Sequence, residues 1–456
     1  MTQSGHRKWC AQLFLVAFRL RVSMDKKSRS LIRRSAIRIG LSFSLSVLCN
    51  NAVGQDRCDI YPDFALTPPP INRDPGPEYA EWTRSYQGMP SIERMQNGRL
   101  WAAWTSGGIN EGPDNYIVLV TSIDDGRSWS PPKMTIDPPG NVTAFVPILW
   151  RDPNDRLWVF WNQGYGAWWD GRGGAWAVVG EEAESPSPQW ASPRRIAHGW
   201  PGSKPTVLES GNWLLPVFVF HTGSQLAEEN EYYRLGLTPC VINTLSHDLG
   251  SLKGANVYRS DDEGSSWHFL GQANRSPTEQ DAADADLLEH SVIERSDGSL
   301  WMLIRTPPGI AEAQSSDGGS TWSPVEESSI RHPLSRFFVR RLKSGRILMV
   351  RHDPPSIVYP DECDNCGGMN RSHLTAYLSS DDGRSWDGGL LLDERETVSY
   401  PDGVEAQDGR IFVIYDRSRY TDSEIFMAVF TEEDVLGGLC VSNHCRLRVT
   451  VSQPNL

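Results

Sequence analysis

The chain is poor in basic residues and, beyond residue 54, has no apolar run long enough to cross a bilayer. Its 44 Lys and Arg are outnumbered by 57 Asp and Glu, which gives a formal net charge of −13. Binding of a nucleic acid needs a basic surface, so nucleic acid is excluded as the main partner. A nucleotide-binding glycine loop, an HExxH motif and a serine nucleophile elbow are also absent from the sequence. We therefore expect no cofactor and no membrane span.

What the chain does contain favours an all-β fold. With 39% hydrophobic and 22% charged residues it is long enough to bury a large core. The 18 Trp, 40 Gly and 31 Pro indicate short strands joined by many tight turns.

Residues 1–54 have the pattern of a secretory signal rather than of a folded domain. A basic stretch follows Met24, an apolar run covers Ile39–Leu48, and the small residues Ala52–Gly54 suit a cleavage site before Gln55. Met24 is an alternative start of the chain. We expect a monomeric protein that is secreted or periplasmic.

Six cysteines follow the signal: Cys58, Cys240, Cys363, Cys366, Cys440 and Cys445. An even number in an exported chain is typical of disulfides. Cys440 and Cys445 suit a local bridge, and Cys58 either pairs with Cys240 or stays free. Cys363 and Cys366 have the spacing of half a zinc site, but no second pair matches them, so no metal is expected.

A hairpin pattern, Ser-x-Asp-x-Gly-x-x-Trp, occurs four times. Ser and Asp accept hydrogen bonds from turn amides, Gly supplies a positive φ, and Trp anchors the outgoing strand. The four copies are Ser122–Trp129, Ser260–Trp267, Ser315–Trp322 and Ser379–Trp386, and a decayed copy lies at Ser185–Trp190.

A second pattern, a turn followed by an apolar strand, occurs six times. The copies are Asn97–Ala102, Asn154–Val159, Ser210–Leu215, Asp297–Met302, Ser344–Met349 and Asp408–Val413. Their spacing of about 50 to 90 residues suits four-stranded propeller blades with insertions. We predict an N-terminal extension over 55–80, a six-bladed β-propeller over 81–435, and a tail over 436–456 that closes or flanks it.

The four hairpin boxes and the phrase Glu289–Arg305 resemble the sialidase (neuraminidase) superfamily, in its divergent bacterial type with BNR or Asp-box repeats. The resemblance covers roughly residues 80 to 430. It implies that the innermost strand of each blade, just before each of the six turns, opens into a central funnel. The entrances of those strands are Gly88–Pro90, Phe145–Pro147, Ser203–Pro205, Glu289–Ser291, Ser335–Phe337 and Ser399–Pro401.

The resemblance also implies a catalytic pair and a site for a carboxylate. Tyr400 matches the family's nucleophile and Glu289 the base that takes its phenolic proton. Arg305 and Arg371 match two members of an arginine triad that holds the carboxylate of an acidic sugar. An arginine that ends an apolar strand, as Arg305 does, needs a partner or a ligand.

The chain departs from that pattern at two places. Gly88 stands where the family has the first triad arginine, and Asn110 aligns best with its Asp acid/base. Glu111 or Asp114 could replace that acid. Sialic acid hydrolysis of the usual kind is thereby in doubt, and the functional hypothesis widens to other acidic sugars such as uronates.

Three further polar residues come from the inner segments: Lys204, Arg336 and His352. They could supply positive charge for a differently shaped acidic sugar, or be surface charges. The loop Gly164–Trp176 is rich in glycine and tryptophan, which suits either a sugar-stacking platform or a hairpin whose rings plug between blades.

The leading hypothesis is an exported glycosidase that removes a terminal acidic sugar from a glycan. The alternatives are a hydrolase or a lyase for another acidic sugar on the same scaffold, and a carbohydrate-binding propeller without catalysis.

Overall fold

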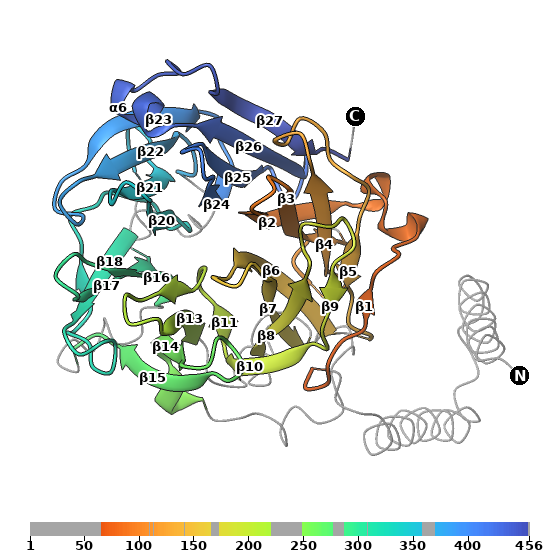
Figure 1. Cartoon of the computed structure of the whole chain (residues 1–456), viewed down its shortest axis with the longest axis horizontal. Helices are drawn as coiled ribbons and strands as arrows, with labels where there is room; N and C mark the ends of the chain where they lie inside the picture. The colour runs from red at the N-terminus through yellow and green to blue at the C-terminus, as the bar shows by residue number, and fades with distance from the viewer. Residues whose placement is uncertain are drawn as a thin grey trace, which may run out of the picture. The chain divides into compact units, whose positions relative to one another are not determined.

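The computed structural model describes residues 65–454 apart from 109, 113, 141, 166–172, 220–248, 277–286, 308 and 358–369. The signal segment, Cys58, Cys240, Cys363 and Cys366 lie outside the described residues. The described chain forms six antiparallel sheets that surround a common centre (Figure 1). The predicted six-bladed all-β propeller is confirmed.

Each blade runs outward from its innermost strand, and blades follow one another along the chain. The first three blades contain β1 (Ile71–Asn72), β2 (Tyr86–Arg94), β3 (Leu100–Gly107), β4 (Tyr116–Ser122) and β5 (Met134–Ile136); β6 (Val142–Arg151), β7 (Leu157–Tyr165), β8 (Gly174–Glu181), β9 (Gln189–Trp190) and β10 (Arg194–His198); β11 (Trp200–Pro201), β12 (Thr206–Val207), β13 (Trp213–Val219), β14 (Gly254–Ser260) and β15 (His268–Ala273).

The last three blades have four strands each. They are β16 (Leu288–Glu294), β17 (Leu300–Thr306), β18 (Gly309–Ser315) and β19 (Glu326–Glu327); β20 (Phe338–Arg341), β21 (Ile347–His352), β22 (Leu374–Ser379) and β23 (Asp387–Asp393); β24 (Val398–Glu405), β25 (Ile411–Arg417), β26 (Glu424–Phe430) and β27 (Arg446–Ser452). The short helices are η1 (Pro77–Tyr79), η2 (Glu81–Thr83), η4 (Gly250–Leu252) and α6 (Glu432–Gly437).

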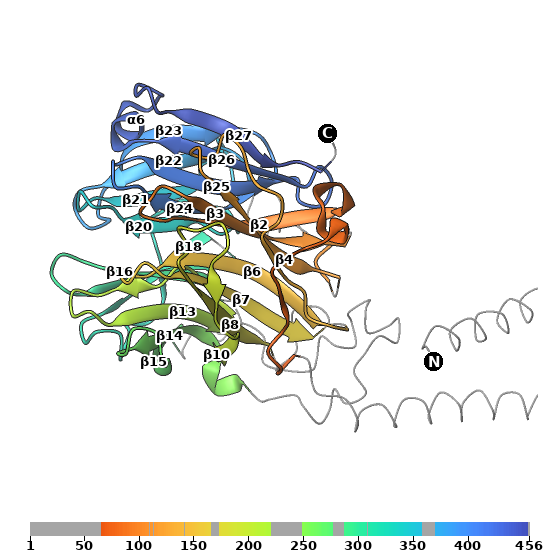
Figure 2. The same ribbon diagram turned by 45° about the vertical axis from the view of Figure 1, so that its right-hand side comes forward.

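Both ends of the described chain add strands to blades. β1 pairs with β5 on the outside of the first blade, and β27 is the outermost strand of the sixth. In both ribbon views β2 lies beside β24, which closes the ring between the last blade and the first (Figures 1 and 2).

The two repeated sequence patterns occupy fixed places in the blades. The six turns join each innermost strand to the second strand, and the four boxes join the third strand to the fourth strand of blades one, three, four and five. In the box at Ser260, the amide of Gly264 donates to Ser260 Oγ at 2.8 Å and the amide of Ser266 donates to Asp262 Oδ1 at 2.8 Å. Gly264 has φ +81°, and a Cβ there would lie 2.5 Å from Trp158. Glycine is therefore required by both conformation and space.

The core lies between the blades. Six apolar clusters in the described chain each join two neighbouring blades, and one of them, which includes Ile92 and Trp104 with Phe412 and Met427, closes the ring. Burial of these faces drives the association of the sheets.

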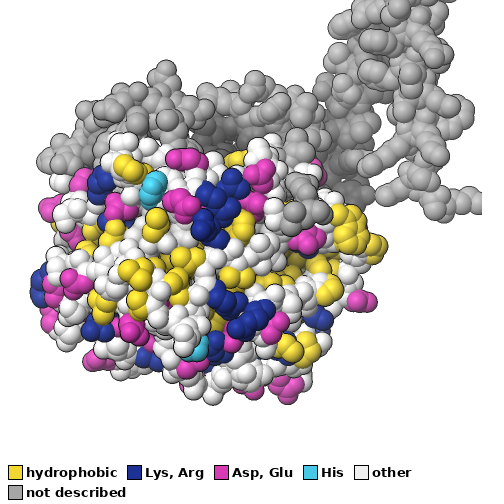
Figure 3. Space-filling view, turned by 90° about the horizontal axis from the view of Figure 1, so that it is seen from above, with side chains coloured by type: hydrophobic (Ala, Val, Ile, Leu, Met, Phe, Trp, Pro, Cys, Tyr) yellow, Lys and Arg dark blue, Asp and Glu magenta, His cyan; other side chains and the backbone are white. Residues whose placement is uncertain are grey.

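The remaining features concern the surface and the C-terminal segment. The predicted bridge between Cys440 and Cys445 is present. On the face in Figure 3, groups of Lys and Arg side chains are bordered by Asp and Glu. Among the described residues, no helix combines the length and apolar character that crossing a membrane requires.

Candidate active site

The innermost strands carry irregularities at the entrances that the sequence indicated. The pairing register shifts in β2 between Gly88 and Ser91, in β6 between Phe145 and Ile148, and in β24 between Ser399 and Asp402. β16 has a similar shift between Leu288 and Ser291. Bulges of this kind re-aim side chains and are frequent beside active sites.

Three of these bulges place a non-glycine residue in the left-handed region, each directly before a proline. The φ angles are +57° for Met89, +48° for Val146 and +54° for Tyr400. The three side chains meet in one buried cluster with Tyr86 and Phe145. Such backbone costs about 1–3 kcal/mol per residue and persists where the surrounding structure enforces it. In β24 this strained backbone brings the side chain of Tyr400 into contact with residues of the first two blades.

Tyr400, Glu289 and Arg305 form a buried group contributed by β24, β16 and β17. Arg305 Nη1 donates to Glu289 Oε2 at 2.5 Å and to Tyr400 Oη at 3.1 Å. Glu289 and Tyr400 therefore share one guanidinium nitrogen of Arg305. The exposed fractions are 7% for Tyr400, 5% for Glu289 and 8% for Arg305. A phenol and a carboxylate are thus bridged by one guanidinium, and all three side chains are largely shielded from solvent.

The charges of this group are set by its neighbours. Burial favours protonation of Glu289, but the charges of Arg305 and Arg336 and a hydrogen bond with Tyr400 hold its pKa below the ordinary value. Burial and the charge of Glu289 raise the pKa of Tyr400 above its ordinary value. At neutral pH Glu289 is therefore a carboxylate and Tyr400 a neutral phenol.

Three more arginines surround the Tyr400 ring. The distances from the guanidinium carbon to the ring centroid are 5.9 Å for Arg336, 6.0 Å for Arg371 and 4.4 Å for Arg419. Burial, followed by the charges of Arg305 and Arg419, lowers the pKa of Arg371 to about 10. The site therefore concentrates positive charge around a neutral phenol.

Several guanidinium nitrogens in this site are buried without a hydrogen-bond partner in the described part of the chain: Arg305 Nε, Arg336 Nη1 and Arg371 Nε. A buried donor left unpaired costs about 1–3 kcal/mol, and more when it is charged. An arrangement of this kind suits an anionic ligand that would pair with it.

The two alternative acids separate clearly. Glu111 Oε1 accepts from Tyr86 Oη at 3.1 Å, from Arg419 Nη1 at 3.3 Å and from Tyr420 Oη at 2.7 Å. All three hydrogen bonds are accepted by Oε1, and none of these three donors contacts Oε2. Asp114 is exposed, and its side chain lies beside Gly108. Glu111 thus shares Arg419 with the Tyr400 site.

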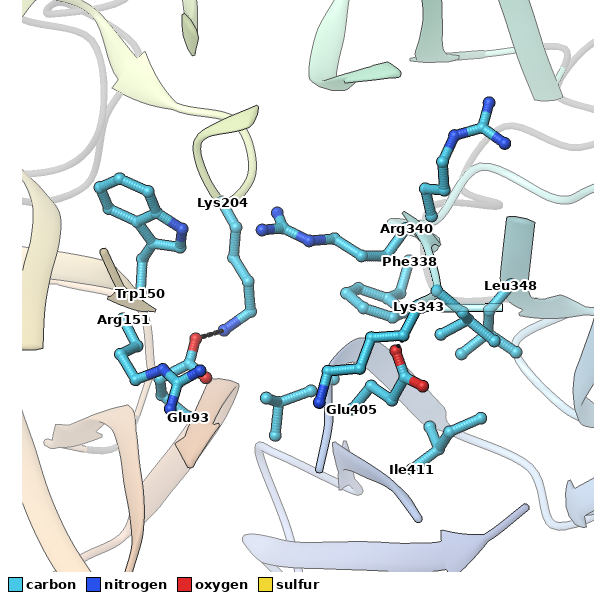
Figure 4. A pocket seen from close by; sticks show the side chains of 14 residues that line it. Glu93, Trp150, Arg151, Lys204, Phe338, Arg340, Lys343, Leu348, Glu405 and Ile411 are labelled. Atoms are coloured by element: carbon cyan, nitrogen blue, oxygen red, sulfur yellow. Dashed lines mark hydrogen bonds and ion pairs between the residues drawn. The ribbon is translucent and has the colours of Figure 1, made fainter. Parts of the chain in front are cut away.

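Lys204 does not join the other predicted binding residues. Its Nζ donates to the carbonyl oxygens of Ile92 at 2.7 Å and Leu149 at 2.6 Å, and it pairs with Glu93 and Asp402 at 3.2 Å each. It lines a cavity of about 380 Å³ at the far ends of the innermost strands (Figure 4). These oxygens satisfy the ammonium group of Lys204, which therefore makes no contact with Tyr400.

His352 also lies elsewhere, inside blade five. Its ring nitrogens contact Ser335 Oγ and the Ser372 carbonyl oxygen at 3.2 Å each, and the ring stacks on His332. Burial, the neighbouring His332 and Arg371 lower its pKa well below the ordinary value. A neutral core histidine results, which brings no positive charge to a ligand.

The aromatic loop is only partly described. Trp176 is 2% exposed and stacks on Trp161 at 6.5 Å between the centroids, within the cluster that joins blades one and two. Trp176 therefore packs between blades, while Trp168 and Trp169 lie outside the described residues. No group of three or more His, Cys, Asp or Glu suited to a metal ion occurs in the described chain.

Arg419 is a residue that the sequence reasoning missed. It lies just after β25, as Arg305 lies just before the end of β17, and both strands are the second of their blades. The rule that selected Arg305 would have drawn attention to Arg417 and Arg419, although the sequence does not say which of them turns inward.

Comparisons with known proteins agree with this fold. A family model described as a BNR repeat-like domain matches residues 98–413, while no curated protein matches the chain. A protein of unknown function from Dyadobacter fermentans is 16% identical with a TM-score of 0.53, over 75% of this chain and 93% of that one. The intramolecular trans-sialidase of Ruminococcus gnavus, in complex with oseltamivir carboxylate, is 14% identical with a TM-score of 0.54, over 78% and 97%.

A leech intramolecular trans-sialidase, complexed with 2,7-anhydro-Neu5Ac, is 12% identical with a TM-score of 0.55, over 81% of this chain and 71% of that one. Identities this low show a common fold and leave the chemistry to the residues of each chain. The family model covers more than half of the sequence, and the chain therefore belongs to the BNR repeat-like family of the sialidase-like superfamily.

Proposed function

We propose that this protein is a glycosidase that releases a terminal acidic sugar from a glycan, with Tyr400 as nucleophile and Glu289 as its base. Arg305, Arg336 and Arg371 hold the carboxylate of the sugar. The observation that carries the proposal is the set of unpaired guanidinium nitrogens around a buried, neutral tyrosine that shares the guanidinium of Arg305 with the carboxylate of Glu289.

The arginines favour a carboxylate in this place. Guanidinium forks match a carboxylate bidentately, and a charge-assisted hydrogen bond is worth about 1.5–3 kcal/mol. A carboxylate ligand also offsets the repulsion that Arg371 experiences from Arg305 and Arg419. A neutral sugar would leave these donors unpaired.

A neutral phenol is a suitable nucleophile beside a bound carboxylate, because an anionic one would repel it. Tyr400 Oη forms a bond to the anomeric carbon as its proton passes to Glu289. The bond to the leaving oxygen breaks, and that oxygen takes a proton from Glu111. Water then cleaves the tyrosyl intermediate, giving a proton to Glu111 as Tyr400 regains its own from Glu289.

Glu111 is preferred to Asp114 for the acid and base role. It shares Arg419 with the Tyr400 site, and its Oε1 is fixed by three donors. Its Oε2 can then carry the transferred proton. Asp114 is exposed and lies beside Gly108.

The test is turnover of aryl glycosides of sialic acids and of uronic acids by the wild type and by Tyr400→Phe. The wild type should release the aryl group from at least one acidic sugar, and Tyr400→Phe should lose about 10³-fold or more in kcat. Tyr377→Phe is the matched control. Tyr377 lies in blade five, and its hydroxyl donates to the carboxylate of Asp353. Unchanged turnover in Tyr400→Phe would refute the mechanism.

Analysis of the products and of glycan binding separates the alternatives. A lyase acting on a uronate would leave an unsaturated product that absorbs ultraviolet light. A binding propeller would retain glycans on an array and release nothing from any substrate.

We also propose that the protein is exported, on the basis of the signal pattern in residues 24–54. Sequencing of the mature N-terminus should start near Gln55. A mature chain that begins at Met1 or Met24 would contradict export through this segment.

A further inference from the structure

Arg419 occupies the space beside Gly88 where the first triad arginine is missing. A Cβ added to Gly88 would lie 3.2 Å from Arg419 Cβ, 3.3 Å from Arg419 Cδ and 3.2 Å from Tyr86 Oη. These contacts are closer than ordinary van der Waals packing. A side chain at position 88 and the present position of Arg419 therefore compete for one volume.

The contacts of Arg419 connect the two proposed catalytic groups. Its guanidinium carbon lies 4.4 Å from the centroid of the Tyr400 ring, and Nη1 donates to Glu111 Oε1 at 3.3 Å. A cation on the ring face fixes the ring plane, and the hydrogen bond fixes the carboxylate.

Arg419 is itself held firmly. Nη2 donates to Ser399 Oγ at 2.6 Å and to the two oxygens of Asp416 at 3.0 and 3.2 Å. Asp416 also accepts from the amide of Met89 at 2.7 Å and from Ser399 Oγ at 2.7 Å. The buried ion pair thus ties the bulges of β2 and β24 together at the place where Tyr400 enters the site.

We propose that Arg419 is a positioning residue that holds Tyr400 and Glu111 in register with each other, in the space that Gly88 leaves open. The inference rests on the proposed glycosidase function. Position 88 on β2 carries no side chain in this chain, so the positioning role falls to Arg419 after β25.

The first test compares Arg419→Ala and Arg419→Lys with the wild type on the acidic aryl glycoside that the wild type cleaves. Arg419→Ala should lower kcat by about 100-fold with a smaller change in KM, since misplacement of reacting groups mainly affects the chemical step. Arg419→Lys should recover part of that loss because it keeps the charge. Arg417→Ala is the matched control, since Arg417 pairs with Asp422 and Glu424 instead.

The second test places arginine at position 88. Gly88→Arg alone should lower kcat/KM and the thermal midpoint, because the new side chain displaces Arg419. In the Arg419→Ala background the same substitution should have the opposite sign and raise kcat/KM above that of Arg419→Ala. This reversal would not occur if Arg419 only stabilised the fold at a distance from position 88.

The outcomes are distinct. A wild type without turnover on every acidic glycoside refutes the proposed function. An active wild type with normal turnover in Arg419→Ala, or with equal losses from Gly88→Arg in both backgrounds, refutes the role of Arg419. Thermal midpoints of all variants distinguish these results from unfolding.

Discussion

Replacing Glu289 by glutamine keeps the shape of the side chain and removes one charge from a buried ion pair. The partner Arg305 is left with its Nη1 beside a neutral amide, at a site where Arg336 also contributes positive charge. Loss of one partner from a buried pair typically costs about 3–5 kcal/mol. In a propeller of this size each kcal/mol corresponds to about 1–2 °C, so Glu289→Gln should lower the thermal midpoint by about 3–10 °C at pH 7.

The pH dependence gives this prediction a sign. The pKa of Glu289 in the folded protein lies below the ordinary value of 4.5. The stabilisation is therefore fully present above that value and is lost as the pH falls through the folded pKa. The gap in thermal midpoint between wild type and Glu289→Gln should be widest at neutral pH and should shrink below pH 4.5.

The assay is thermal unfolding of both proteins across this pH range by calorimetry. Glu312→Gln is the control, because Glu312 accepts from the neutral Trp301 Nε1 and an amide oxygen can do the same. Equal midpoints of wild type and Glu289→Gln at pH 7, or a gap that widens in acid, would refute the ion-pair reasoning.

Two further predictions separate scaffold from site. Gly264→Ala should destabilise the fold by about 1–3 kcal/mol more than Gly298→Ala in chemical denaturation, because both glycines have φ near +80° but only the first would clash with a neighbour; equal losses would contradict the packing argument. Lys204→Met should lower the thermal midpoint and leave KM unchanged, whereas Arg371→Lys should raise KM about 10-fold or more with little change in midpoint. A raised KM in Lys204→Met would place Lys204 in the substrate site after all.

Much of the scaffold was predictable because its signals are local. A turn residue with positive φ and the apolar strand after it form a pattern of six residues. One such pattern occurs in each of the six blades. The boxes are equally local, since Ser260 and Asp262 bond to amides within the same hairpin. The entrances could also be located, because each begins seven to nine residues before its turn.

The site was less predictable because it depends on where long side chains end. Lys204 and Arg336 both come from inner segments, yet Lys204 reaches backbone oxygens at the far ends of the strands while Arg336 lies over Tyr400. His352 follows an apolar strand as Arg305 does, but its ring is satisfied inside the blade. Sequence periodicity gives the face of a strand and not the partner at its end.

Arg419 was missed for a related reason. Its place is fixed by Asp416 and by the empty volume at Gly88, and neither relation is visible along the chain. The absence of an arginine at position 88 was read as a loss, whereas the structure fills that volume from the sixth blade.

In the proposed mechanism Tyr400 forms the covalent intermediate. The most direct measurement is mass spectrometry of peptides from protein treated with a glycosyl fluoride of the cleaved acidic sugar that carries a second fluorine beside the anomeric carbon, which slows hydrolysis of the intermediate. A nucleophilic Tyr400 predicts a sugar adduct on the peptide that contains Tyr400, and no adduct in Tyr400→Phe. An adduct on another residue, or inactivation without any adduct, would contradict it.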